Sequence, residues 1–145
     1  SIVVGEDVNG YQKIVDASIS ALQKAIAAVK SGVKIADIGG IIEKEAKKHH
    51  YKVIENLTGH GVGLSLHEEP LDLLNYRDVN DKRRLRKNSV IALETFISEN
   101  SNEAIEQADG WTMIGNNPGV FAQHEHTVLV TSEGPMILTL MNENW

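Results

Sequence analysis

The stretch Val90-Ile91-Ala92-Leu93-Glu94-Thr95-Phe96-Ile97 places a single carboxylate in a run of β-branched and apolar residues. Such residues favour strands, and successive side chains of a strand point to opposite faces. Both faces of this strand are largely apolar, so we expect it to be buried on both sides. A lone buried carboxylate is costly. Glu94 should therefore form a salt bridge or hydrogen bond, or bind a metal ion.

A second run of this kind, Phe121 to Thr131, ends in a purely apolar segment, so we expect its middle to lie in the interior. Alternation places Glu125 on one face and both His124 and His126 on the other. Two histidines at this spacing can bind one metal ion. Alternatively, Glu125 is the ligand, and the histidines pack or form hydrogen bonds behind it. The local sequence leaves both interpretations open.

Two amphipathic helices precede these strands. Apolar residues at helical spacing predict the first over roughly Glu6 to Lys30. They predict the second around Ile35 to Ala46, followed by a solvated end with His49 and His50. Further strands are predicted at Tyr51 to Leu57 and Met136 to Leu140, and an exposed charged loop at Asp78 to Lys87. Helices followed by strands predict one α+β domain, residues 1–145, with both helices on one face of an antiparallel sheet.

Composition restricts the class of protein. The 145 residues are 41% hydrophobic and 23% charged, with a net charge of -6. Nucleic acids and anionic membranes need a basic surface, so we expect neither as the main partner. There is no cysteine, which excludes disulfides and thiolate ligands and fits a cytoplasmic location. No signal peptide is recognisable at the start, and no apolar run approaches the roughly 20 residues of a membrane span.

His60 lies between glycines in Gly59-His60-Gly61-Val62-Gly63, and His67 follows in His67-Glu68-Glu69-Pro70. An odd separation would place the two histidines on opposite faces of one strand, so the chain must bend between them for both to reach one site. Each histidine alone is more often structural. Together with Glu94 and Glu125 they form a set of oxygen and imidazole donors that suits Mn, Fe, Co, Ni or Zn. Bridging carboxylates can hold two such ions, which predicts metal-assisted hydrolysis.

Six segments together resemble type I methionine aminopeptidases of the pita-bread fold, in both order and spacing. They are Gly59 to Gly63, His67 to Pro70, Ile91 to Glu94, Asp109 to Thr112, and Gln123 to Thr131 with Gly134 to Leu138. The resemblance extends over essentially the whole chain. It implies the carboxy-terminal half of a fold whose two similar halves face each other across the active site.

The resemblance also implies roles for individual residues. His60, Glu94 and Glu125 match metal ligands, with Glu125 bridging two divalent ions. His67 matches the histidine that contacts the scissile peptide, and Glu94 the carboxylate that handles protons. Trp111 matches an aromatic residue near the methionine pocket, with a buried core residue as the alternative. The implied substrate is the amino terminus of a peptide or nascent protein. The histidines that flank Glu125 become less favoured as ligands.

The chain also departs from the family pattern. Thr95 stands where proline is usual, and His124 where an aromatic residue is usual. Two aspartate ligands of the family and a further histidine have no counterpart. We therefore expect the site to need a missing amino-terminal half or association with another copy. Two alternatives remain: another pita-bread hydrolase, such as a proline-specific peptidase, and a non-catalytic binding module.

Overall fold

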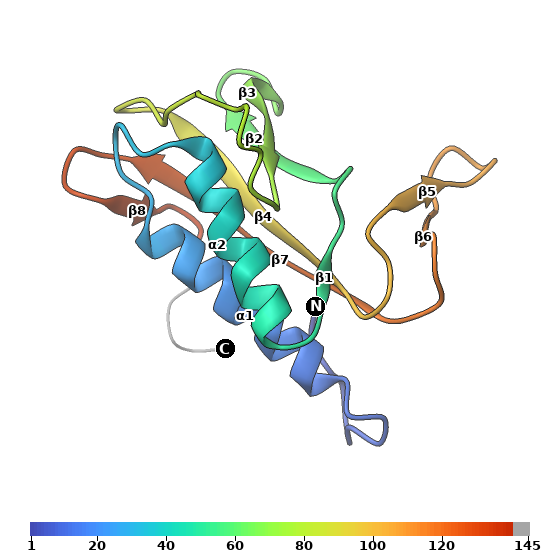
Figure 1. The fold of residues 1–145 in the computed structure, drawn as a ribbon. Helices are drawn as coiled ribbons and strands as arrows, with labels where there is room; N and C mark the ends of the chain where they lie inside the picture. The colour runs from blue at the N-terminus through green and yellow to red at the C-terminus, as the bar shows by residue number, and fades with distance from the viewer. Residues whose placement is uncertain (141–145) are drawn as a thin grey trace.

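The computed structural model describes residues 1–140, so the last five residues of the predicted domain lie outside the described part. Helices α1 (Gln12–Ala27) and α2 (Ile35–Lys48) lie together on one face of an antiparallel sheet (Figure 1). The predicted α+β class is therefore confirmed. The strands are β1 (Lys52–Val53), β2 (Thr58–Val62), β3 (Glu68–Leu74), β4 (Val90–Ser98), β5 (Ala104–Glu106), β6 (Met113–Gly115), β7 (Phe121–Val130) and β8 (Pro135–Ile137).

The main sheet has the strand order β3-β2-β4-β7-β8. Strand β1 pairs with the carboxy-terminal end of β4, at Ile97 and Ser98. Strands β4 and β7 form its centre and pair without interruption from Val90↔Leu129 to Ser98↔Phe121. This long pairing fixes which side chains share a face, because residues opposite each other in an antiparallel pair point the same way. Strand β2 joins the other side of β4, with His60 opposite Ala92.

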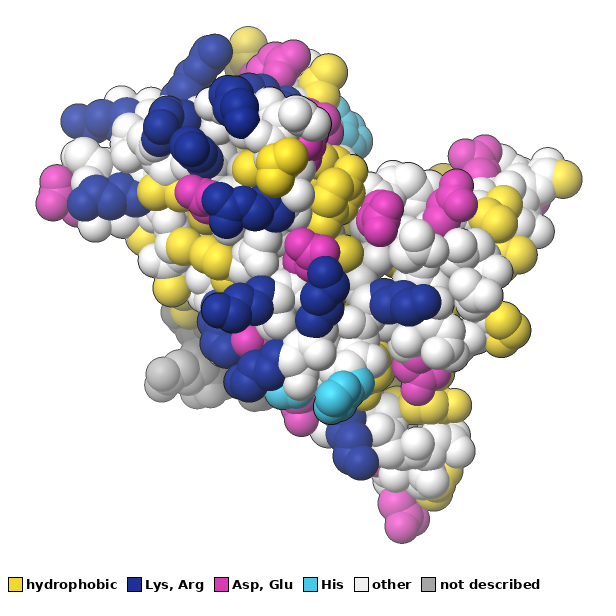
Figure 2. Space-filling view, viewed as in Figure 1, with side chains coloured by type: hydrophobic (Ala, Val, Ile, Leu, Met, Phe, Trp, Pro, Cys, Tyr) yellow, Lys and Arg dark blue, Asp and Glu magenta, His cyan; other side chains and the backbone are white. Residues whose placement is uncertain are grey.

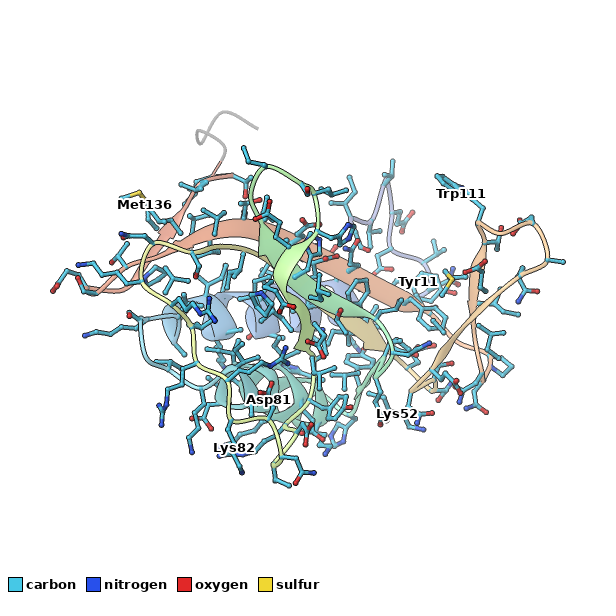
Figure 3. All side chains as sticks on the ribbon, turned by 90° about the horizontal axis from the view of Figure 1, so that it is seen from above. Tyr11, Lys52, Asp81, Lys82, Trp111 and Met136 are labelled. Carbon is cyan, nitrogen blue, oxygen red and sulfur yellow. The ribbon has the colours of Figure 1, made fainter. Side chains whose placement is uncertain are left out.

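The hydrophobic core lies between the helices and the sheet. On β4 the odd-numbered residues point to the helices, and on β7 the even-numbered residues do so. Ile91, Leu93, Ile97 and Val128 of these sets are almost completely buried. The opposite face of the sheet has no helix over it in the described part of the chain (Figures 1 and 3). The expectation that the middle of Phe121 to Thr131 lies in the interior is therefore wrong for Glu125, which is exposed.

Some element boundaries differ from the prediction for local reasons. Helix α1 begins at Gln12 rather than near Glu6, because the Asp7 carboxylate accepts the N–H groups of Tyr11 and Gln12 at 2.7 and 2.9 Å. Helix α2 matches its prediction. The strand predicted over Tyr51 to Leu57 is only Lys52–Val53, and the last strand is Pro135–Ile137 rather than Met136 to Leu140. The sequence analysis did not identify β2, β3, β5 or β6.

Strands β5 and β6 form a separate hairpin that projects from the body of the molecule (Figure 1). Its turn contains the predicted Asp109-Gly110 pair, with Gly110 at a φ of +68°. The charged loop from Asp78 to Lys87 is largely exposed as predicted, although Leu85 is buried beneath it. Lys and Arg side chains gather on the helix-covered face toward this loop (Figure 2). No helix within residues 1–140 is long and apolar enough to span a membrane.

Candidate metal and substrate site

Three neighbouring strands place His60, Glu94 and Glu125 on the open face of the sheet. Glu94 and Glu125 are direct partners in the β4–β7 pairing. His60 lies opposite Ala92 on the adjacent strand, and Ala92 shares its face with Glu94. The sheet therefore brings an imidazole and two carboxylates to one face from distant parts of the sequence.

Glu94 is held by neighbours on both sides. Its Oε2 accepts a hydrogen bond from Gln123 Nε2 at 2.9 Å, and its Oε1 lies 3.6 Å from His60 Nε2. The side chain is only 12% exposed. Burial, followed by the nearby charge of Glu125, raises the pKa of the Glu94 carboxyl above its ordinary value. A cation placed beside Glu94 would therefore oppose both effects.

His60 presents a free nitrogen to this carboxylate. Its Nδ1 lies 2.8 Å from the carbonyl oxygen of Gly61, which can only accept, so Nδ1 carries the proton. In the neutral ring, Nε2 then carries no proton, and its lone pair faces Glu94 Oε1 at a distance of 3.6 Å. Metal ligands of this kind bind at about 2.0–2.2 Å, so one ion can contact both atoms. These two side chains therefore fit a shared metal ion.

His67 reaches the same site from the loop between β2 and β3. Its ring centroid is 4.0 Å from that of His60, with the planes tilted by 41°. The pairing of β2 with β3 shifts register between Gly59 and Gly61. A Cβ on Gly61 would lie only 2.4 Å from the Glu69 carbonyl oxygen. The predicted bend between the two histidines is confirmed, and glycine at position 61 permits it.

Trp111 lies away from this cluster, at the turn of the projecting hairpin (Figure 3). It is 88% exposed, so the alternative of a buried core residue is wrong. Its assignment to a methionine pocket stays a prediction. Between the hairpin and the sheet lies a largely apolar cavity of about 200 Å³, which borders Gln123. Its apolar lining includes Ile54, Leu57, Phe96, Met113, Ile114 and Phe121.

His124 and His126 point to the helix-facing side of β7. His124 Nδ1 lies 2.9 Å from Ser18 Oγ, and its Nε2 lies 2.7 Å from the Ser1 carbonyl oxygen. Burial lowers the pKa of His124. His126 Nδ1 is 2.9 Å from Thr139 Oγ1. The histidines therefore form hydrogen bonds behind Glu125, as one of the two interpretations proposed.

Asn75 is a supporting residue that the sequence analysis did not identify. It is completely buried. Its side-chain amide donates to the Glu94 carbonyl oxygen at 3.0 Å and accepts the Phe96 N–H at 2.9 Å. Asn75 thus holds the backbone on both sides of Thr95. A polar residue directly after the apolar pair Leu73-Leu74 was the only sequence signal, and it also fits an ordinary turn.

The donors do not complete a metal site by themselves. Within residues 1–140, no three His, Cys, Asp or Glu side chains lie close enough together to hold a metal ion. The aspartates serve other purposes. Asp7 accepts N–H groups at the start of α1, Asp37 pairs with Arg77, and Asp72 and Asp81 pair with Arg83. Asp72 lies within β3. None of these supplies the two aspartates that the resemblance requires.

An antiparallel sheet that presents an imidazole and two carboxylates on one face defines a candidate half of a metal centre. The family model for "Metallopeptidase family M24" matches residues 1–132. The methionine aminopeptidase of Staphylococcus epidermidis is 40% identical over 144 residues, which are 99% of this chain and 57% of that protein. The chain belongs to metallopeptidase family M24.

Solved structures agree with this assignment. The methionine aminopeptidase of Thermotoga maritima superimposes with a TM-score of 0.89 at 33% identity, over 97% of this chain and 56% of that one. A prolidase from Pyrococcus furiosus gives 0.70 at 27% identity, over 98% of this chain and 36% of that one. The fold is that of the pita-bread methionine aminopeptidases, and the chain spans about half the length of the relatives it matches.

Proposed function

We propose that this chain supplies one side of a two-metal site that removes methionine from the amino terminus of peptides or nascent proteins. The observation that supports this most directly is the lone pair of His60 Nε2 facing Glu94 Oε1 at 3.6 Å. Glu125, opposite Glu94 on β7, adds a second carboxylate on the same face. The similarity to methionine aminopeptidases favours this substrate over proline-containing ones, because the prolidase match has lower identity and a lower TM-score.

His60, Glu94 and Glu125 would hold the metal ions. Bound divalent ions would lower the pKa of a water molecule and polarise the peptide carbonyl. Glu94, whose Oε1 lies 3.6 Å from His60 Nε2, would be the carboxylate that exchanges a proton with that water. His67, next to His60, would donate a hydrogen bond to the carbonyl oxygen as negative charge develops on it. The apolar cavity beside Gln123 would take an apolar side chain of the peptide.

The second metal ion would need ligands that residues 1–140 do not bring to the site. We propose that a partner half of the fold, or a second copy of the chain, supplies them by covering the open face. The metals consistent with these donors are Co, Mn, Fe, Ni and Zn. We further propose a cytoplasmic location, where nascent chains present their amino termini.

The test is hydrolysis of a Met-Ala-Ser peptide by the chain mixed with the amino-terminal half of a relative and loaded with Mn²⁺ or Co²⁺, compared with hydrolysis of an Ala-Pro dipeptide. Release of methionine that is lost in Glu125→Ala supports the proposal. Preferential cleavage of Ala-Pro would favour a proline-specific peptidase instead. A chain that binds neither ion and cleaves neither peptide, alone or mixed with the amino-terminal half of a relative, would favour a binding module. A homogeneous monomer of 15.9 kDa with full activity would contradict the need for a partner.

A further inference from the structure

A buried chain of polar side chains lies directly behind the two candidate carboxylates. Thr95 follows Glu94, His124 precedes Glu125, and these two residues face each other in the β4–β7 pairing. Ser18 of α1 connects them. Its Oγ lies 2.8 Å from Thr95 Oγ1 and 2.9 Å from His124 Nδ1. Ser18 and Thr95 are completely buried.

When the His124 ring is neutral, the hydrogen-bond donors and acceptors of these three side chains have a consistent arrangement. The Ser1 carbonyl oxygen can only accept, so His124 Nε2 carries the proton and donates to it across 2.7 Å. Nδ1 is then an acceptor, and the Ser18 hydroxyl donates to it. The Thr95 hydroxyl then donates to Ser18 Oγ, its nearest acceptor at 2.8 Å, with the Ser18 and His124 carbonyl oxygens farther away at 3.4 and 3.3 Å. Each side chain therefore depends on the next for its orientation.

The position of these side chains is unusual for this face of the sheet. Their neighbours Leu93, Ile97, Ala122 and Val128 are aliphatic and fill the core against the helices. A buried hydroxyl that loses its partner costs about 1–3 kcal/mol. Sliding β4 against β7, or moving α1 away, would separate Thr95, Ser18 and His124. The hydrogen bonds therefore favour one register and one tilt of the strands that carry Glu94 and Glu125.

We propose that Ser18, Thr95 and His124 act as one positioning unit that holds the candidate carboxylates at a fixed separation and thereby strengthens metal binding. The unit touches neither metal nor substrate and acts through the backbone of the two strands. Its effect on metal affinity rests on the proposed metal site, whereas its effect on the strands does not. Residues that orient metal ligands in this way typically change metal affinity by about 10- to 100-fold.

The decisive comparison is Thr95→Val with Thr95→Ser. Valine keeps the branched shape and removes the hydroxyl, whereas serine keeps the hydroxyl. The matched control is Ser20→Ala on the same helix, because the Ser20 hydroxyl donates to Glu45 rather than to this unit. Amide hydrogen exchange is measured on the metal-free 145-residue chain. Co²⁺ affinity is measured separately by calorimetry.

We expect Thr95→Val to speed amide exchange at least about tenfold around Glu94 and Glu125, while β3 and β8 stay unchanged. Co²⁺ should bind about tenfold more weakly or worse. Thr95→Ser should resemble the parent in both measurements. If Thr95→Val does not fold, His124→Phe, which removes the two ring nitrogens that form these hydrogen bonds, is measured in the same way.

Equal exchange and equal Co²⁺ affinity in the valine and serine variants would overturn the proposal. A uniform rise in exchange over all strands, equal to that of Ser20→Ala, would also overturn it, because the unit would then only stabilise the fold. Absence of Co²⁺ binding by the parent chain would contradict the proposed metal site. The local exchange around Glu94 and Glu125 would in that case still decide whether these residues position the strands.

Discussion

Glu94 and Glu125 lie directly opposite each other on β4 and β7, with both carboxylates on the open face of the sheet. Opposed like charges are unfavourable in a β-sheet. Here they coincide with the burial of Glu94, and both effects raise its pKa. The pair therefore costs stability in the metal-free chain. Such a cost is typical of a functional site, where the geometry serves binding rather than folding.

Replacing Glu125 with glutamine should lower the pKa of Glu94. The substitution removes the nearby negative charge and leaves burial as the main cause of the raised value. The pKa is measured from the carboxyl carbon chemical shift of Glu94 during an NMR titration of the metal-free chain. Glu133→Gln, in the turn before β8, is the control and should leave the Glu94 titration unchanged. An unchanged pKa in Glu125→Gln would show that the two carboxylates do not interact.

Glu94→Gln should stabilise the metal-free chain at neutral pH. The folded-state pKa of Glu94 is raised, so its contribution to stability is present below the unfolded pKa and is lost as pH rises through the folded pKa. We expect the variant to melt a few degrees higher at pH 7, with the difference disappearing below about pH 4. Excess Mn²⁺ should reverse the order, because only the parent keeps the carboxylate. A lower melting temperature for the metal-free variant at pH 7 would contradict this account.

Glu45 should have the opposite pH dependence. Hydrogen bonding to Lys24, assisted by Ser20 and His49, lowers its pKa from 4.5 to about 2. Its contribution is therefore present above the unfolded pKa and lost as pH falls toward 2. Glu45→Gln should cost about 1–3 kcal/mol at pH 7, measured by urea unfolding. The difference from the parent should shrink between pH 4.5 and 2.

The control for Glu45 is Glu43→Gln, two residues earlier on the same helix. Glu43 pairs with Lys47, whose side chain is 69% exposed, so the pair is screened by solvent. The substitution should change the unfolding free energy by less than about 0.5 kcal/mol. Equal losses in the two variants would show that the buried position of Glu45 does not matter.

Gly39 and Gly40 are neighbours on α2 that should respond oppositely to alanine. A Cβ on Gly39 would lie 2.3 Å from the Tyr76 carbonyl oxygen, and this backbone cannot easily move away. We expect Gly39→Ala to cost about 1–3 kcal/mol. A Cβ on Gly40 would lie 3.2 Å from the Arg77 Cβ, so the two segments would need to separate by only a few tenths of an ångström. Gly40→Ala should gain up to about 1 kcal/mol from helix propensity, as measured by urea unfolding.

The sequence predicted those elements whose periodicity is long and undisturbed. Helix α2 and the strands β4 and β7 belong to this group. It did not reveal β2, because glycine weakens strand propensity. Yet the sheet requires those glycines: a Cβ on Gly59 would lie 2.4 Å from the Ala92 carbonyl oxygen. Local propensity therefore gave no indication of a strand that tertiary packing forms.

The same difference between local pattern and tertiary packing applies to the candidate site. Alternation correctly placed Glu125 on one face of the strand and the flanking histidines on the other, because the face to which a side chain points is a local property of the strand. The contact between His60 and Glu94 depends on the pairing of β2 with β4, which the sequence could not give. Exposure of Glu125 was also missed, because the apolar segment at the end of its strand suggested that the middle lies in the interior. The residues that a side chain contacts depend on the pairing of strands that are distant in sequence. The face to which it points depends only on its own strand.

Asn75 offers a final test, because it supports the site without facing it. Asn75→Asp keeps the oxygen that accepts the Phe96 N–H but replaces the donor to the Glu94 carbonyl with a second acceptor. Two acceptors then face each other in a completely buried place. We expect a loss of about 2–4 kcal/mol in urea unfolding at pH 7. The loss should diminish at low pH, where the protonated aspartate can donate again. A loss that is independent of pH would show that the shape of Asn75, rather than its donor, is what β4 requires.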